Sequence, residues 1–161
     1  MEGQKFSWQD ASTSDCPISR GLTLLGRPWA LLIARDLLQG IRRFDGLHSK
    51  LGASRPVLTA RLRELEAAGV IRRVPYREAG ERTRHEYRLT ERGLDLYPIL
   101  LAIREWGERH LLDGEGTSPV SVHRGCGAMV EIDLRCAAGH IGLNVNDTEA
   151  MLDLEARSRT S

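Results

Sequence analysis

The fold is decided by residues 44–68, which read FDGLHSKLGASRPVLTARLRELEAA. Apolar residues recur at helical spacing in both halves of this stretch: Phe44, Leu47 and Leu51, then Leu58, Leu62 and Leu65. Gly52 and Ser54 fit the connection between two helices, because glycine can end the first and serine can cap the second. The stretch therefore predicts a short helix, a turn of about three residues and a longer helix, the order of a helix-turn-helix.

Two further helices are expected upstream of this pair, and a β-hairpin downstream of it. Pro17 suits the first position of one helix, and Pro28 is expected to open another that includes Trp29. β-Forming residues at 70–77 and 85–89 flank a polar segment with a central glycine. This arrangement predicts a hairpin with a charged tip.

Beyond the hairpin we expect one long helix and then an appendage. Thr90 suits the cap of a helix from Glu91 to about Leu112 that bends at Pro98. The fold class is thus mainly α with a small β-hairpin (α+β): a winged helix-turn-helix with a long C-terminal helix and a small β-rich appendage. The expected parts are a flexible arm at 1–15, the winged domain at 16–112, a linker at 113–119, and the appendage at 120–161 with a short acidic helix from about Asp147.

The composition is that of a soluble globular chain, with 161 residues, 41% of them hydrophobic and 28% charged. No apolar run approaches the roughly 18–20 residues that cross a bilayer. The polar N-terminus lacks the apolar core of a secretory signal. We therefore expect a cytoplasmic protein with no membrane partner. Three cysteines make an odd count, so a disulfide framework is not expected.

The net charge of +1 hides an uneven distribution along the chain. Residues 20–92 hold 16 Arg or Lys and 8 Asp or Glu, whereas residues 1–19 and 93–161 are net acidic. A basic block inside a nearly neutral chain favours a polyanionic partner for that block. The alternative is a solvated arginine-rich surface, and charge by itself does not separate the two.

A helix-turn-helix beside a basic hairpin suits duplex DNA, because the major groove admits one helix and a second helix can hold it there. With the three leucines of the longer helix facing the core, the candidate DNA-binding residues are Arg43, Ser54, Arg55, Pro56, Thr59, Arg63, Arg77, Arg82 and Arg84. We expect Arg55 to contact guanine O6 and N7, and Arg63 to contact a phosphate. The hairpin arginines suit a narrow minor groove or the backbone. Taken singly, each arginine could instead be solvated or ion-paired.

The ordered set of motifs resembles the HxlR-type, MarR-like winged-helix regulators of prokaryotes over about residues 16–112. The matching segments are CPI at 16–18, LLG at 24–26, WALLIARDLL at 29–38, RF at 43–44, LTARLREL at 58–65 and RHEYRLT at 84–90, followed by Gly93, Pro98, Leu100 and Trp106. The resemblance implies a homodimer that binds a near-palindromic operator in double-stranded DNA and usually represses transcription.

The long helix independently favours a dimer. Leu96, Leu100 and Ile103 form one stripe, and Ile99 and Trp106 lie off it, so the apolar surface is wider than one core contact needs. The alternative is that Trp106 packs inside its own subunit. A cleft between the dimer helices would suit a small-molecule effector. The candidate dimerisation residues are Ile18, Leu22, Leu96, Ile99, Leu100, Ile103 and Trp106.

Two side hypotheses concern the cysteines. Cys16 stands at a helix start, where a thiolate is favoured, and it matches the position at which some relatives in this family sense oxidants or electrophiles. The alternative is a partly buried residue without a signalling role. The appendage holds His123-x2-Cys126 and Cys136-x3-His140, four side chains that suit a structural zinc ion. The alternative there is an appendage without metal.

The predicted function is a sequence-specific DNA-binding transcription regulator. An enzyme is not expected, because the sequence contains no recognisable nucleophile–base arrangement and no glycine-rich phosphate loop. The rival from another class is a winged-helix interaction module that contacts protein instead of DNA. The arginines of the hairpin count against this rival.

Overall fold

The computed structural model describes residues 12–77, 83–112 and 119–150. The chain divides into two compact units: Pro17–Val130, and a second formed by Met1–Cys16 with Glu131–Ser161. The first unit contains the α-helices and strands of the described residues. Within the described ranges, no helix is both long and apolar enough to span a bilayer.

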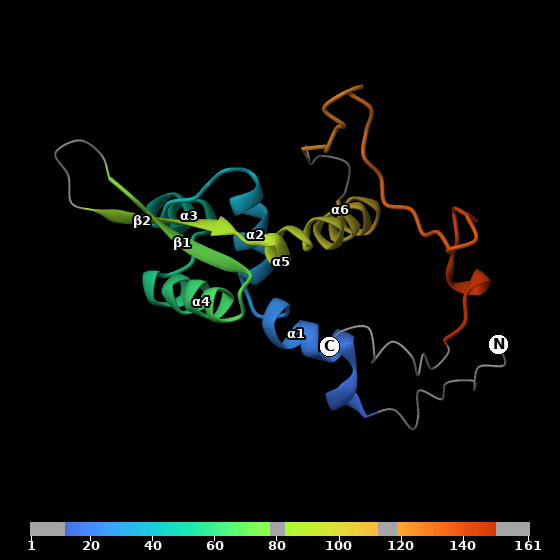
Figure 1. The fold of residues 1–161 in the computed structure, drawn as a ribbon, viewed down its shortest axis with the longest axis horizontal. Helices are drawn as coiled ribbons and strands as arrows, with labels where there is room; N and C mark the ends of the chain where they lie inside the picture. Colours follow the sequence, from blue (N-terminus) through green and yellow to red (C-terminus); the bar gives the residue numbers. More distant parts are fainter. Residues whose placement is uncertain (1–11, 78–82, 113–118, 151–161) are drawn as a thin grey trace. The chain divides into compact units, whose positions relative to one another are not determined.

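Four helices precede the hairpin in the first unit (Figure 1): α1 Pro17–Leu25, α2 Ala30–Leu38, α3 Phe44–Leu51 and α4 Arg55–Ala67. The predicted helix-turn-helix pair is confirmed as α3 and α4. The prediction that Trp29 lies inside the second helix is wrong. Trp29 is the N-cap of α2 in a left-handed conformation, with φ 75°, and the Ala30 N–H donates to the Arg27 carbonyl at 3.2 Å. Pro28 and Trp29 therefore form a turn, in the positions that proline and a positive-φ residue take in type II turns.

The predicted hairpin is also confirmed, as β1 Ile71–Tyr76 and β2 Arg84–Leu89. The strands pair antiparallel in one two-stranded sheet, with Ile71 opposite Leu89 and Tyr76 opposite Arg84. Figure 1 shows the end of β1 and the start of β2 on the side away from α5 and α6. We call this hairpin the wing.

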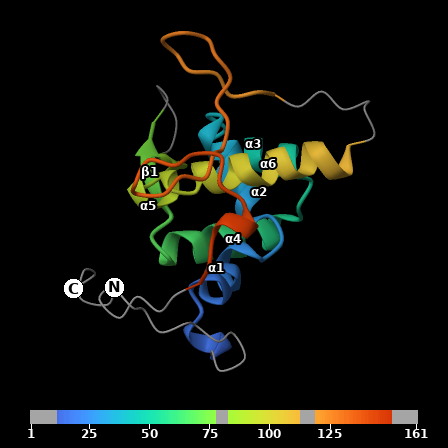
Figure 2. The same cartoon turned by 90° about the vertical axis from the view of Figure 1, so that its right-hand side faces the viewer.

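The predicted single helix at 91–112 is two helices, α5 Glu91–Leu94 and α6 Tyr97–Leu111. The cause is Pro98 at the start of α6, because proline has no N–H for the carbonyl four residues back and its ring occupies that space. Figure 2 shows α6 running across α2, with which it is in contact.

A single core holds the helices and the base of the wing together. Its side chains come from α2, α3, α4, β1 and the segment before α6. The largest apolar side chains that are completely buried are Ile33, Leu47, Leu58, Leu62, Leu65 and Ile71. Burial of one such side chain stabilises the fold by about 1.5–3 kcal/mol.

The appendage has less regular structure than predicted. In residues 119–150 the structure contains one isolated β-bridge, between Val122 and Met129, and one 3-10 helix, η2 Val145–Asp147. The acidic helix expected from about Asp147 is not found up to residue 150, and the positions after it lie outside the described residues. Large apolar side chains such as Val122 and Met129 are more than half exposed here, so strands have no core against which to form.

Thr90 joins the wing to the end of α4. Its hydroxyl donates to the Gly69 carbonyl at 2.6 Å and accepts the Gly93 N–H at 3.2 Å, which confirms the predicted cap. A Cβ added at Gly93 would lie 2.2 Å from the Val70 carbonyl oxygen and 2.8 Å from the Leu89 side chain. The contact between α5 and the base of the wing therefore requires glycine at this position.

We expect Gly93→Ala to lower the free energy of unfolding by about 1–3 kcal/mol, because the new methyl group would overlap a backbone carbonyl. Gly21→Ala is the matched control, since a Cβ there meets nothing within 4 Å and alanine favours the helix by up to about 1 kcal/mol. Urea unfolding of both variants measures the difference. Equal stability of the two would contradict the close contact at Gly93.

Candidate nucleic-acid interface

The turn between α3 and α4 consists of three residues and fixes the angle between the helices. Gly52 ends α3 in the left-handed conformation with φ 65°. Ala53 is buried, and Ser54 takes the extended N-cap conformation of α4 without a side-chain cap hydrogen bond. Serine at the predicted cap position is thus confirmed, but its hydroxyl does not serve the helix.

The two faces of α4 differ as the sequence predicts. Leu58, Leu62 and Leu65 are buried in the core, with at most 1% of their surface exposed. The predicted DNA-binding residues on the other face are exposed at Ser54, Arg55, Pro56 and Arg63 and half-buried at Thr59. The helix therefore presents a guanidinium group near its start and another two turns later.

Arg55 is held by α3, an arrangement that the sequence did not reveal. Asp45, in the first turn of α3, accepts from Arg55 Nη2 at 2.6 Å and from Nη1 at 3.3 Å, both through Oδ1. The Arg55 Cζ also lies 5.2 Å from the centroid of the Phe44 ring. Helical spacing identifies neighbours within one helix, so it could not pair residues of two different helices.

Arg43 lies at the N-cap of α3, beside the wing. Its guanidinium carbon is 4.5 Å from the centroid of the Tyr76 ring on β1, which is within the range of a cation–π contact. The Arg42 carbonyl accepts from the Tyr87 N–H on β2 at 2.8 Å. The segment before α3 is thereby tied to both strands of the wing.

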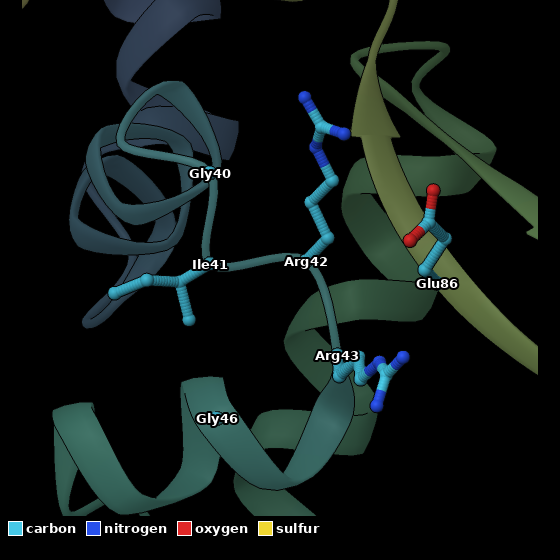
Figure 3. Close-up of a pocket in the computed structure, with 6 residues that line it drawn as sticks. All are labelled: Gly40, Ile41, Arg42, Arg43, Gly46 and Glu86. Atoms are coloured by element: carbon cyan, nitrogen blue, oxygen red, sulfur yellow. The ribbon is translucent and has the colours of Figure 1, made fainter.

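A shallow cavity of about 360 Å³ opens at this junction. Figure 3 shows the side chains of Arg42 and Arg43 leaving the backbone toward the side where Glu86 lies, while Ile41 points the other way. Glu86 itself pairs with Arg88 at 2.6 Å. The lining residues are Gly40, Ile41, Arg42, Arg43, Gly46 and Glu86.

Two of the three predicted wing arginines are described. Arg77 and Arg84 are exposed and border the tip of the hairpin, whereas Arg82 lies outside the described residues. Arg77 directly follows the last residue of β1, and Arg84 is the first residue of β2. The wing therefore carries basic side chains on both sides of its tip.

An ion pair braces the wing against α4. Glu66 accepts from Arg73 Nε at 2.9 Å, and this hydrogen bond raises the pKa of Arg73. Tyr87 lies opposite Arg73 in the sheet, and its partial burial raises the pKa of its phenol. Arg73 therefore stays a cation and Tyr87 a neutral phenol at physiological pH.

The predicted dimerisation residues fall into two groups. Leu96 is buried and Leu100 packs against the core, so both serve the fold of a single chain. Five others are exposed by 43–66%: Ile18, Leu22, Ile99, Ile103 and Trp106. We call these five the exposed apolar set. Trp106 is 56% exposed and its ring lies 5.4 Å from the ring of His110 on the same helix, so it is not part of the core of its own chain.

The two Cys/His pairs belong to different units and have similar geometry. His123 Nδ1 lies 3.3 Å from Cys126 Sγ, and His140 Nδ1 lies 3.2 Å from Cys136 Sγ. A tetrahedral zinc ion separates a nitrogen and a sulfur ligand by about 3.5 Å, so each pair fits two of its four positions. Among the described residues no three possible ligands gather. The zinc site therefore stays a prediction.

The helix-turn-helix pair and its two-stranded wing define a winged helix-turn-helix protein. Residues 24–115 match the HxlR-like helix-turn-helix family. The chain belongs to this family, and the resemblance seen in its motifs is confirmed.

Known relatives agree with this assignment. The chain is 42% identical over 119 residues to an HTH-type transcriptional regulator of Mycobacterium tuberculosis. The matched stretch covers 74% of each protein. The crystal structure of PA1607, described as a transcription factor, has a TM-score of 0.76 at 37% identity and covers 87% of this chain and 96% of its own. The structure of the redox regulator HypR in its oxidized form has a TM-score of 0.53 at 35% identity, and the match covers 58% of this chain and 96% of HypR. The chain is a DNA-binding transcription regulator.

Cys16 precedes α1 in the chain, after the 3-10 helix η1 Thr13–Asp15. It is a half-buried free thiol, and its N–H donates to the Thr13 carbonyl at 3.3 Å. The name of HypR describes that protein as a redox regulator. An oxidant-sensing role for Cys16 stays a prediction.

If the four Cys and His side chains of the hypothesis hold zinc, tag-free protein should contain about one zinc per chain. Cys126→Ser and Cys136→Ser should each lower this content, because a structural site needs all four ligands. Cys16→Ser, outside the set, is the matched control and should leave it unchanged. Elemental analysis after dialysis measures the content, and less than about a tenth of a zinc per chain would end the hypothesis.

Proposed function

We propose that the chain is a homodimeric repressor whose α4 enters the major groove of a near-palindromic operator. One observation carries the proposal: α4 buries three leucines in the core and leaves Arg55 and Arg63 exposed. A helix in the major groove needs such a division, because its apolar face fixes its position while the opposite face meets base edges and phosphates. Repression is what membership of the family implies.

Neighbouring elements supply the contacts that would position α4. The Ser54 hydroxyl makes no cap hydrogen bond, and the N–H groups of the first turn of α4 favour a phosphate. Arg77 and Arg84 flank the tip of the wing, where they suit the backbone or a narrow minor groove. Arg43 lies between α3 and the wing, where a contact of its guanidinium with a phosphate would also help to position α4.

The test of DNA readout begins with wild-type protein and duplex fragments selected by binding. Affinity should fall steeply as salt rises, because bound arginines release counterions from the phosphates. Arg55→Ala should weaken binding to the selected site by about 1–3 kcal/mol and relax the preference for one base. Arg63→Ala, the control, should weaken binding to all sequences by similar factors.

Two outcomes would count against this reading. Equal losses for Arg55→Ala at every operator variant would remove its base-reading role. Wild-type protein with no salt-sensitive binding to any duplex would favour the interaction module instead. Fluorescence anisotropy at several salt concentrations gives both results.

The exposed apolar set supports a second copy of the chain as partner. Ile99, Ile103 and Trp106 recur at intervals of four and three along α6, which places them on one face. Ile18 and Leu22 form a similar pair on α1. A near-palindromic operator presents two equivalent half-sites, and a two-fold dimer would bring two α4 helices to them about 34 Å apart.

Ile103→Glu is expected to weaken self-association at least tenfold, since it would place two carboxylates in an apolar interface. Ile141→Glu is the matched control, because Ile141 is 72% exposed and lies outside the exposed apolar set. Sedimentation equilibrium should give twice the chain mass of 18.0 kDa for wild type and for the control. A dimer of unchanged affinity in Ile103→Glu would place the interface elsewhere.

A further inference from the structure

The side chain of Arg55 is fixed from two sides by residues of α3. Asp45 Oδ1 accepts from both terminal nitrogens, and the Phe44 ring lies beneath the guanidinium. Phe44 is in turn stacked on His48, with the ring planes 12° apart. The guanidinium therefore has a defined direction before any ligand arrives.

Stability does not account for this pair. The side chains of Arg55 and Asp45 are 57% and 80% exposed, and exposed ion pairs contribute at most about 1 kcal/mol. Asp45 gains from the dipole at the start of α3, but any first-turn carboxylate gains this without Arg55. In addition, a carboxylate on the proposed DNA-binding face would repel phosphates.

We propose that Asp45 is a positioning residue that orients Arg55 for base readout, and so determines the base preference of α4. The inference rests on the proposed function. Arginine has five N–H donors, and the Asp45 oxygen takes one from each terminal nitrogen. The edge formed by Nε and its neighbouring terminal nitrogen keeps two parallel donors. Two such donors are what a guanine O6 and N7 pair accepts.

Pre-orientation matters because the arginine side chain has about 2 kcal/mol of rotamer entropy to lose. If Asp45 already holds the guanidinium, less of that entropy is lost when the base contact forms. Without Asp45 the same side chain reaches other bases and phosphates with similar ease. Asp45 would therefore act on the ratio between affinities for different sequences.

The experiment separates this ratio from absolute affinity. Asp45→Ala removes a negative charge near the phosphates, so it should strengthen binding to unrelated duplex DNA. The experiment compares the affinity for the selected site with the affinity for a DNA site changed at the base that Arg55 prefers. The ratio of the first affinity to the second should nevertheless fall about fivefold or more. Asp45→Asn should lower it too, because a neutral amide holds a guanidinium weakly. In the Arg55→Ala background, Asp45→Ala should not change the ratio further.

Glu108→Gln is the matched control. Glu108 lies 3.6 Å from Arg104 in a partly buried ion pair of α6, so its loss also removes one carboxylate but should leave the ratio unchanged. Urea unfolding of each variant shows whether the fold is intact, which is expected because Asp45 is exposed.

Two results would overturn the inference. An unchanged ratio in Asp45→Ala would make the contact an ordinary surface ion pair, and a higher ratio would make Asp45 a competitor of DNA for Arg55. Both results are informative only when two conditions hold: the wild-type protein binds duplex DNA, and the Arg55→Ala substitution removes its base preference. If either condition failed, the proposed function would be overturned instead, so failure of the proposed function and failure of the role of Asp45 are distinguishable.

Discussion

The burial of Leu58, Leu62 and Leu65 determines where every other group of the interface lies. These side chains are almost completely enclosed, and Leu47 of α3 is in the same core. Removing one of them from the core would cost about 2–5 kcal/mol, a large share of the 5–15 kcal/mol that stabilises a typical domain. The rotation of α4 about its axis is therefore fixed by packing. The direction in which its exposed face points follows from that rotation.

Polar contacts then adjust the positions of α3, α4 and the wing relative to one another, which packing fixes only approximately. The Thr90 hydroxyl binds the wing to the end of α4, and the pair of Glu66 and Arg73 joins the two elements again further along. The contact of Asp45 with Arg55 crosses between α3 and α4. The two ion pairs contribute little to the free energy of folding, because their arginines are more than half exposed. Their effect is on geometry, which decides whether an arginine meets a base edge or a phosphate.

The sequence predicted those elements whose signals are local. The bounds of α3 and α4 followed from leucine spacing with Gly52 and Ser54, and the wing followed from β-forming residues on both sides of a glycine. Three features depended on other information. The turn at Trp29 places a large side chain at positive φ, which composition does not favour. The break between α5 and α6 occurs at Pro98, where the sequence predicts only a bend in one continuous helix. The partner of Arg55 required the distance between two helices, which residue spacing does not contain.

These contacts leave the interface of one chain with little internal freedom, since α4, the wing and α5 are tied at several points. In a dimer of the proposed kind, the remaining variable would be the distance between two α4 helices. That distance would depend on the exposed apolar set rather than on the residues that contact bases. Duplex half-sites have a fixed spacing of about 34 Å per turn, so a small change between subunits would disrupt both contacts together. Regulation at the dimer contacts would thus need no change within the recognition surface itself.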